Sequence, residues 1–243
     1  LFGGQLPMTG RTRITVPEDF IANGVGELVS DSVADGRRTS TWVTDEPVMA
    51  FNVIAGRHVV KRGEGTALYY DPAHHYNVDE MLGAMNSARR WYGEWFGTYP
   101  WKLLKVTEFP ALAGYAQGFP TNISFSEGIG FLTKSDPRTH LAFMVTAHEI
   151  AHQWWGNMLQ PGRGPGANLL SEGMSHFSTM LLLEQEKGFR AGYETRKRFE
   201  SRWGEQRRAD AERKLYEIDG TKDGDGVVTY EKAGWTFWML ADL

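Results

Sequence analysis

Two histidines and a glutamate in the middle of the chain have the residue types and the spacing of a metal site. His148, Glu149 and His152 form the pattern H-E-x-x-H. On a helix, residues four apart lie on one face, so both imidazoles can bind the same metal ion. Glu149 lies beside the first histidine, where it can reach a metal-activated water without binding the metal. This arrangement suits zinc hydrolysis. The alternative is three surface residues that fell together by chance.

The residues around the motif predict a buried helix over positions 139–157. Apolar residues recur there at roughly helical spacing, and Gly156, near the end, is the one helix breaker. Trp154 and Trp155 follow the second histidine directly and indicate a packed environment. Such packing favours a metal site over a chance pattern.

A zinc site needs a third protein ligand. The metzincin pattern would have Gly and His where this chain has Trp155 and Met158, so that type is excluded. Glu172, in the first turn of a second predicted helix, fits instead. His176, one helical turn further on, is the competing ligand. We interpret His176 as a residue that supports the site, because metal ligands commonly have such neighbours.

The motif H-E-x-x-H-x-W-x-G-N, followed by a helix with x-E-G, resembles the zinc aminopeptidases of the aminopeptidase N type, which are thermolysin-like gluzincins. Residues 230–234 resemble the Y-E-K-G of that family. Residues 41–56 resemble the last strands of its N-terminal β domain, and residues 108–110 and 123–127 resemble the sheet before its zinc helix. The resemblance covers nearly the whole chain. Among its varieties, the chain most resembles the bacterial one fused to ABC-2-type transporter permeases.

The resemblance implies a zinc metallopeptidase, most simply an aminopeptidase that releases N-terminal residues. It implies one zinc ion (Zn2+) per chain, held by His148, His152 and Glu172, with Glu149 as the general base. It also implies that Tyr230 stabilises the transition state, a role that the family pattern alone assigns.

The resemblance places substrate recognition before the zinc helix. The stretch A-Q-G-F-P stands where other members have G-A-M-E-N, so that Gln117 takes approximately the place of their amine-binding glutamate. The backbone around Gly114, Ala116 and Gly118 is expected to hold the peptide substrate. Glu127 is a further residue expected to read the substrate amine.

The chain departs from the family pattern at two points. Nineteen residues separate His152 from Glu172, one more than is usual, and the loop at 160–166 can hold the extra residue. Gln117 is a neutral amide, which can hydrogen-bond an ammonium group but lacks charge-assisted strength. Two alternatives therefore stay open. One is a zinc hydrolase of the same clan without N-terminal specificity, and the other is a catalytically silent peptide-binding zinc domain of a membrane transporter complex.

The composition narrows the class of protein. The 243 residues are 41% hydrophobic and 23% charged, as is ordinary for a globular chain. The net charge of −4 gives no electrostatic basis for binding nucleic acid. The absence of cysteine excludes disulfides and thiolate metal ligands. No apolar run approaches the roughly twenty residues that span a bilayer. We therefore expect no membrane contact from this segment, which we interpret as a piece of a longer parent protein that can itself be membrane-anchored. Compartment and oligomeric state stay open.

The elements that must position these residues predict an α+β fold. Residues 1–60 are expected to be the C-terminal part of a β-rich N-terminal domain. Residues 61–243 are expected to form a thermolysin-like domain, a small mixed sheet followed mostly by helices, truncated at its C-terminus. The predicted strands cover residues 13–16, 38–42, 48–53, 67–70, 103–109 and 122–125, and the predicted helices cover 78–96, 139–157, 169–187 and 193–208.

Several local features complete the prediction. Asn77 is expected to cap the helix over 78–96, and Asn168 or Ser171 the helix over 169–187. Residues 110–120 are either an ordinary loop or an edge strand that lines the site. Residues 219–230 resemble a calcium loop, but Tyr230 stands at the position of the bidentate glutamate. We therefore interpret that stretch as a turn.

Overall fold

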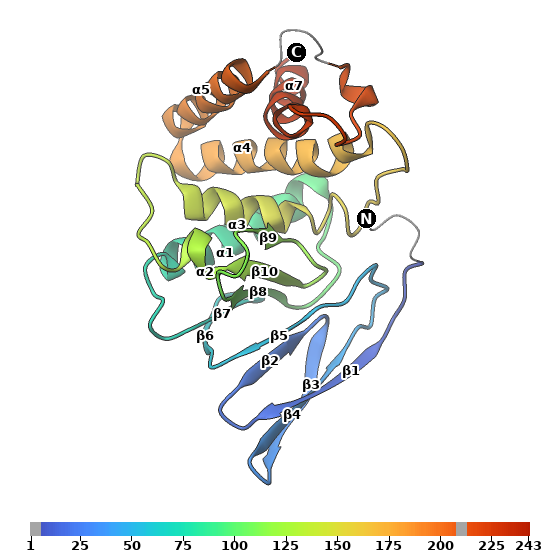
Figure 1. Cartoon of the computed structure of the whole chain (residues 1–243), viewed down its shortest axis with the longest axis vertical. Helices are drawn as coiled ribbons and strands as arrows, with labels where there is room; N and C mark the ends of the chain where they lie inside the picture. The colour runs from blue at the N-terminus through green and yellow to red at the C-terminus, as the bar shows by residue number, and fades with distance from the viewer. Residues whose placement is uncertain (1–5, 208–212) are drawn as a thin grey trace. The chain divides into compact units, whose positions relative to one another are not determined.

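The computed structural model describes residues 6–207 and 213–243 and divides the chain into two compact units, Leu1–Gln153 and Trp154–Leu243. The first unit contains the named strands of the described residues and three helices, whereas the second unit is helical (Figure 1). A mixed sheet together with helices confirms the predicted α+β class. The domain boundary expected at residue 60 is not the division seen between these units, and it stays a prediction.

The first five strands form two small antiparallel sheets. They are β1 (Arg11–Pro17), β2 (Ile21–Gly24), β3 (Glu27–Ala34), β4 (Arg37–Val43) and β5 (Val53–Gly56). β4 lies between β1 and β3, and β2 pairs with β5. Trp42 on β4 is almost fully buried, and its indole N–H donates to the Ala22 carbonyl of β2 at 3.1 Å. That bond fastens the two sheets to each other.

One strand prediction in this region is wrong. A strand was expected over residues 48–53, but β5 begins only at Val53. Val48 forms an isolated bridge with Met8, and both Val48 and Met49 are buried. These apolar side chains fill the core from an irregular segment, which gives the sequence the hydrophobicity of a strand without the conformation.

A five-stranded mixed sheet forms the centre of the first unit. Its strands are β6 (Val59–Arg62), β7 (Thr66–Tyr70), β8 (Leu104–Phe109), β9 (Ala116–Gln117) and β10 (Asn122–Ser126). The order is β6-β7-β8-β10-β9. β7, β8 and β10 run parallel, and the outer strands β6 and β9 run antiparallel to their neighbours. Strands buried on both faces often read as continuous apolar runs, and the run A-L-Y-Y made β7 predictable. In β10 only Ile123 and Phe125 are apolar, although all five of its residues are buried.

Two helices of the first unit pack against each other beside this sheet (Figure 1). α1 spans Val78–Phe96, as predicted, and α3 spans Leu141–Ala151. Met81, Met85 and Ala88 lie on the buried face of α1, together with Tyr92. The Tyr92 hydroxyl donates to the Ala147 carbonyl at 3.3 Å and so fastens α1 to α3.

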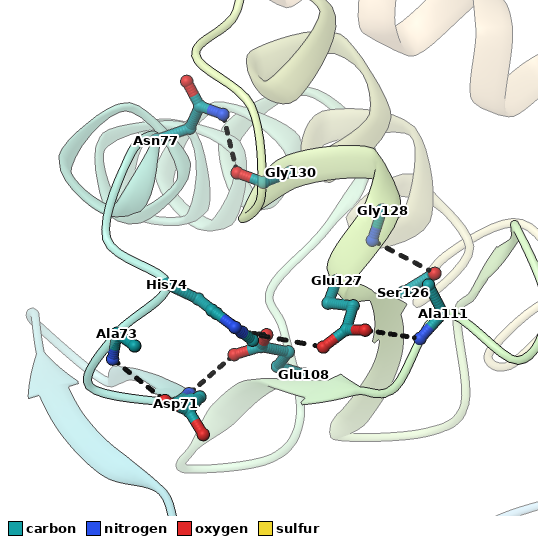
Figure 2. Close-up of polar contacts among 10 residues, drawn as sticks. All are labelled: Asp71, Ala73, His74, Asn77, Glu108, Ala111, Ser126, Glu127, Gly128 and Gly130. Carbon is teal, nitrogen blue, oxygen red and sulfur yellow. Dashed lines mark hydrogen bonds and ion pairs between the residues drawn. The ribbon is translucent and has the colours of Figure 1, made fainter.

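Asn77 occupies the predicted N-cap position of α1, but its side chain does not cap the helix. Asn77 makes no side-chain bond to the first turn of α1. Its amide instead donates to the Gly130 carbonyl at 2.6 Å (Figure 2). The amide also donates to the Thr133 carbonyl at 2.7 Å and accepts from the Ser135 N–H at 2.9 Å. Asn77 therefore fixes the connection between the short helix α2 (Glu127–Gly130) and α3.

The second unit consists of helices that lie side by side (Figure 1). They are η1 (Leu169–Gly173), α4 (Met174–Lys187), α5 (Phe189–Gln206), η2 (Leu215–Glu217), α6 (Asp225–Val227), η3 (Val228–Lys232) and α7 (Ala233–Ala241). A Cβ at Gly173 would lie 2.7 Å from the Ala233 Cβ, and one at Gly234 would lie 2.8 Å from the His176 Cβ. The two glycines therefore allow the helical run from η1 into α4 to touch the run from η3 into α7.

Two further outcomes concern the helices. The helix predicted over 193–208 begins earlier, at Phe189, and position 208 lies outside the described residues. In the part of the chain that the structure describes, no helix combines the length and the apolar character needed to cross a membrane.

Candidate metal centre

Helix α3 holds the two histidines of the motif at a separation that suits one zinc ion. The Nε2 atoms of His148 and His152 lie 3.2 Å apart, and the ring planes stand at 89° to each other. Two nitrogen ligands of a tetrahedral zinc, each about 2.0–2.1 Å from the metal, lie roughly 3.3 Å apart. The histidine pair therefore has the separation expected of two ligands of one zinc ion.

α3 ends earlier than predicted, but the motif keeps its geometry. The helix stops at Ala151, not at position 157. His152 nevertheless has helical dihedral angles, φ −62° and ψ −14°, and its N–H donates to the His148 carbonyl at 3.3 Å. Beyond it the chain turns, and Gly156 has a φ of 135°, which residues with a side chain rarely adopt. Trp154 is buried although it lies beyond the end of the helix. Its apolar character therefore led the sequence analysis to extend the predicted helix too far.

Glu149 lies on the same buried helix. Glu149 is only 7% exposed, and His148 beside it is 9% exposed. A carboxylate in such surroundings interacts with a metal or a proton more strongly than it would in bulk water, because the effective dielectric constant is lower. The geometry is compatible with a general base, and that role stays a prediction.

The segment expected to hold substrate contains an edge strand. Ala116 and Gln117 form β9, which pairs with Phe125 and Ser124 of β10 and occupies the end of the sheet. Within residues 110–120, Ala116 and Gln117 thus form an edge strand and the other residues form a loop, while the lining of a site by this segment stays a prediction. An edge strand has backbone groups on one side that can pair with an extended peptide.

The glycines beside β9 differ in their surroundings. A Cβ at Gly118 would lie 2.7 Å from the Glu149 carbonyl oxygen and 2.7 Å from the His152 Cβ. Gly118 therefore brings the backbone after β9 into direct contact with the motif on α3. Gly114 is exposed and has open space around its Cα, so the fold itself does not require a glycine there.

Glu127 lies in a polar cluster with His74 and Glu108. Glu127 directly follows β10, His74 lies in the loop after β7, and Glu108 is the second-last residue of β8. Figure 2 shows the three side chains directed toward one another. The His74 Nδ1 atom is hydrogen-bonded to Glu108 and lies 3.6 Å from the Glu127 carboxylate. Glu127 also accepts from the Ala111 N–H at 2.9 Å. One potential ligand atom of each member lies within 4.8 Å of the other two.

Burial and hydrogen bonding change the acidity of this cluster. Burial alone would lower the pKa of His74, but the hydrogen bond to Glu108 and the nearby carboxylates raise it above the ordinary value. Burial raises the pKa of Glu108, whose side chain is 3% exposed, although the Asp71 N–H and His74 act in the opposite direction. Both groups therefore hold a proton to a higher pH than they would in water. A role of Glu127 in reading a substrate amine stays a prediction.

Glu172 belongs to the second unit and lies in η1, a single turn of π-helix. Of the two predicted caps, Asn168 occupies the N-cap position, but its side chain makes no cap bond, and Ser171 lies inside the turn. The Ser171 hydroxyl instead donates to the Trp155 carbonyl at 3.2 Å. The wider π-helical turn begins where the sequence favoured an ordinary helix start. Ligation by Glu172 stays a prediction.

Tyr230 also lies in a π-helical turn, η3, of the second unit. Its ring meets that of His176 edge-on, with centroids 5.4 Å apart at 75°. His176 packs on its other side against Phe199, with centroids 4.8 Å apart. His176 therefore supports the Tyr230 ring, which agrees with its interpretation as a supporting residue.

An arginine that precedes the segment resembling a calcium loop pairs with two of its aspartates. The Arg213 guanidinium pairs with Asp219 at 2.8 Å and with Asp225. Asp219 stands at the first position of such a loop, where calcium would need its carboxylate. The turn prediction is wrong for residues 225–230, which are helical in α6 and η3.

Sequence reasoning missed two buried polar residues near the predicted site. Glu108 was predicted only to lie in a strand, and Gln153 was predicted only to be part of the helix that carries the motif. Both are charged or polar at positions where the local pattern is apolar. That mismatch is the signal that could have singled them out, although their partners are distant in sequence.

No protein-family model matches the chain, and no curated protein matches it. Solved structures do match. The M1 zinc metallopeptidase from Deinococcus radiodurans has a TM-score of 0.65 and 20% identity, over 93% of this chain and 51% of that chain. A mutant of it bound to a Tyr-Ser-Ala substrate has a TM-score of 0.64 and 18% identity, over 94% and 51%. A two-domain M1 zinc metallopeptidase mutant bound to L-tryptophan has a TM-score of 0.63 and 20% identity, over 93% and 50%.

The chain has the fold of an M1 zinc metallopeptidase. These structures belong to the aminopeptidase N family that the sequence motifs resemble. The chain spans about half the length of each of them. At this level of identity the likeness concerns the fold, and the zinc chemistry and the substrate of this chain are matters for proposal.

Proposed function

We propose that this chain contains the catalytic part of a zinc metallopeptidase. The observation that carries the proposal is the 3.2 Å separation of the His148 and His152 Nε2 atoms on a buried helix that also carries Glu149. Glu172 would be the third protein ligand, which gives the two-histidine, one-glutamate set of known zinc hydrolases. One zinc ion per chain follows from this set.

Each residue of the proposed site has one task. Zinc, when bound, polarises the scissile carbonyl and lowers the pKa of the attacking water toward about 7. Glu149 would take the proton of that water and hand it to the leaving amine. The Tyr230 phenol would donate a hydrogen bond to the developing oxyanion, and His176 would hold its ring in place.

The substrate is proposed to be a peptide that extends along the outer edge of β9. The observed edge strand supports this, because its backbone offers a row of donors and acceptors to an added strand. Gly114, Ala116 and Gly118 would contribute backbone contacts, and the Gln117 amide, with Glu127, would meet the substrate amine. The M1 structure with a bound Tyr-Ser-Ala substrate is consistent with a peptide ligand.

Aminopeptidase specificity is the finer part of the proposal. A hydrolase of the same clan without N-terminal specificity is the second candidate, and the neutral amide of Gln117 favours it, since an ammonium group would gain less there than from a carboxylate. A silent peptide-binding domain is the third, and the intact Glu149 and Tyr230 argue against it because a structural zinc needs neither. A parent protein fused to a transporter permease belongs to this proposal as well.

Matched substrates separate these candidates. Purified zinc-loaded protein is given one peptide with a free amino terminus and the same peptide N-acetylated. An aminopeptidase cleaves the free form and spares the blocked form. Similar cleavage of both would identify the unspecific hydrolase, and zinc binding without any cleavage would favour the silent domain.

A further inference from the structure

Gln153 is the residue after the second histidine, and both polar atoms of its side-chain amide form hydrogen bonds with one turn. It is fully buried. Its Oε1 atom accepts from the Thr121 N–H at 2.8 Å, and its Nε2 atom donates to the Phe119 carbonyl at 2.9 Å. A buried polar group left without its partner costs about 1–3 kcal/mol, so both bonds are expected to persist.

The turn held by Gln153 connects β9 to β10. Gln117 ends β9, and Asn122 begins β10. Thr121, between them, has a φ of 59°, a conformation that a residue with a side chain adopts at a cost. Its hydroxyl accepts from the Gly26 N–H at 2.7 Å and its carbonyl from the Lys105 N–H at 2.8 Å. Thr121 is therefore fixed at three atoms, one of them by Gln153.

The same turn contacts helix α3 at Gly118, which has no side chain to separate the two backbones. The 2.7 Å that would separate a Gly118 Cβ from the Glu149 carbonyl oxygen leaves no room for an alanine. Gly118 thus sets how close the end of β9 comes to α3. Gln153, two residues beyond the end of α3, bonds the same turn to the chain that leaves the helix.

We infer that Gln153 is a positioning residue that fixes the edge strand β9 relative to His148, Glu149 and His152. The inference rests on the proposed function, in which a peptide lies along β9 and its scissile carbonyl meets the metal. Misplacement of a substrate by about 1 Å can cost about 100-fold in rate. An amide of this length satisfies both Phe119 and Thr121, and a shorter one reaches only one of them.

The test compares two buried amides. Gln153→Met keeps the size of the side chain and removes both hydrogen bonds. Asn77→Leu is the matched control, because it removes a buried amide whose hydrogen-bond partners, Gly130, Thr133 and Ser135, lie outside β9. For each zinc-loaded protein, zinc content, thermal midpoint, kcat and KM are measured with alanyl and leucyl fluorogenic amides.

Both variants should lose stability and keep the zinc content of the wild type. Only Gln153→Met should lose kcat/KM, by about 10- to 100-fold, chiefly through a higher KM, because the metal and Glu149 are intact while the substrate strand is displaced. Gln153→Asn, which keeps an amide but is one methylene shorter, should show the same change of KM even if the methionine variant does not fold.

Two results would overturn the inference. One is a wild-type kcat and KM in Gln153→Met or Gln153→Asn. The other is an equal loss of kcat/KM in Asn77→Leu, which would make the effect one of general stability. Failure of the proposed function is recognised separately, as the absence of turnover by the wild-type protein before any variant is compared.

Discussion

At the level of single residues, the proposed chemistry depends on two imidazole nitrogen atoms and one carboxylate. The spacing of His148 and His152 in the sequence was enough to predict their common face, because four residues are close to one helical turn. Their separation of 3.2 Å could not be read from the sequence, since it depends on side-chain rotamers. The helix around them ended six positions before the predicted end, yet the motif kept its geometry.

Replacement of Glu149 tests the proposed general base. Glu149→Gln should retain zinc, because the amide does not replace any ligand, and should lower turnover by about 100- to 10,000-fold through loss of proton transfer. Zinc content by elemental analysis and kcat on a peptide amide are the two readouts. Normal turnover in this variant would remove Glu149 from the mechanism.

Tyr230→Phe tests the proposed oxyanion donor. The variant keeps the ring that packs edge-on against His176 and loses only the phenol. We expect kcat to fall by about 100- to 1,000-fold with little change in KM, because the lost hydrogen bond forms mainly in the transition state. Tyr216→Phe, at an exposed tyrosine, is the control and should behave as the wild type. Equal activity of the two variants would refute the role.

The His74 cluster predicts a pH dependence of stability. The pKa of His74 is raised in the folded state by Glu108, with Asp71 and Glu127 nearby. Protonated His74 therefore favours folding, and this contribution is fully present below the model-peptide pKa of 6.5 and is lost as the pH rises through the raised folded value. The stability difference between wild type and His74→Gln, from urea unfolding, should be largest below pH 6.5 and should shrink as the pH rises above that value. A difference that grows over this range would contradict the assignment.

At the level of helices and strands, the sequence predicted an element best where apolar residues recurred with a single period. The helix over 78–96 was placed at its observed bounds, because apolar residues recur along it at helical spacing and Gly97 follows. The buried parallel strands were also found. The sequence did not reveal the π-helical turns η1 and η3, which contain Glu172 and Tyr230. Such turns arise from packing between helices, and they occur often at functional sites.

Glycine at the contact between helices of the second unit should be essential for stability. Gly234→Ala would place a Cβ 2.8 Å from the His176 Cβ and force α7 away from α4, at a cost of about 1–3 kcal/mol. Gly204→Ala, in α5, has open space and should be neutral or stabilising by up to about 1 kcal/mol, since alanine favours helices. Urea unfolding of both variants checks this. A more stable Gly234→Ala protein would disprove the close contact.

At the scale of the whole molecule, the α+β class followed from the order of predicted strands and helices, and the likeness to M1 zinc metallopeptidases agrees with it. Two features could not be predicted. The division between Gln153 and Trp154 falls inside the extended motif, where no change of composition marks it. The clamp from Gln153 to Thr121 joins residues far apart in sequence, and such pairings leave no local pattern.

We propose that this chain binds zinc and uses it to cleave peptides. This is tested by the zinc content of the purified protein together with hydrolysis of alanyl and leucyl fluorogenic amides, before and after removal of zinc by a chelator. We expect one zinc per chain and turnover that disappears with the chelator and returns with zinc. A protein that binds no zinc when the ion is supplied in excess would contradict it.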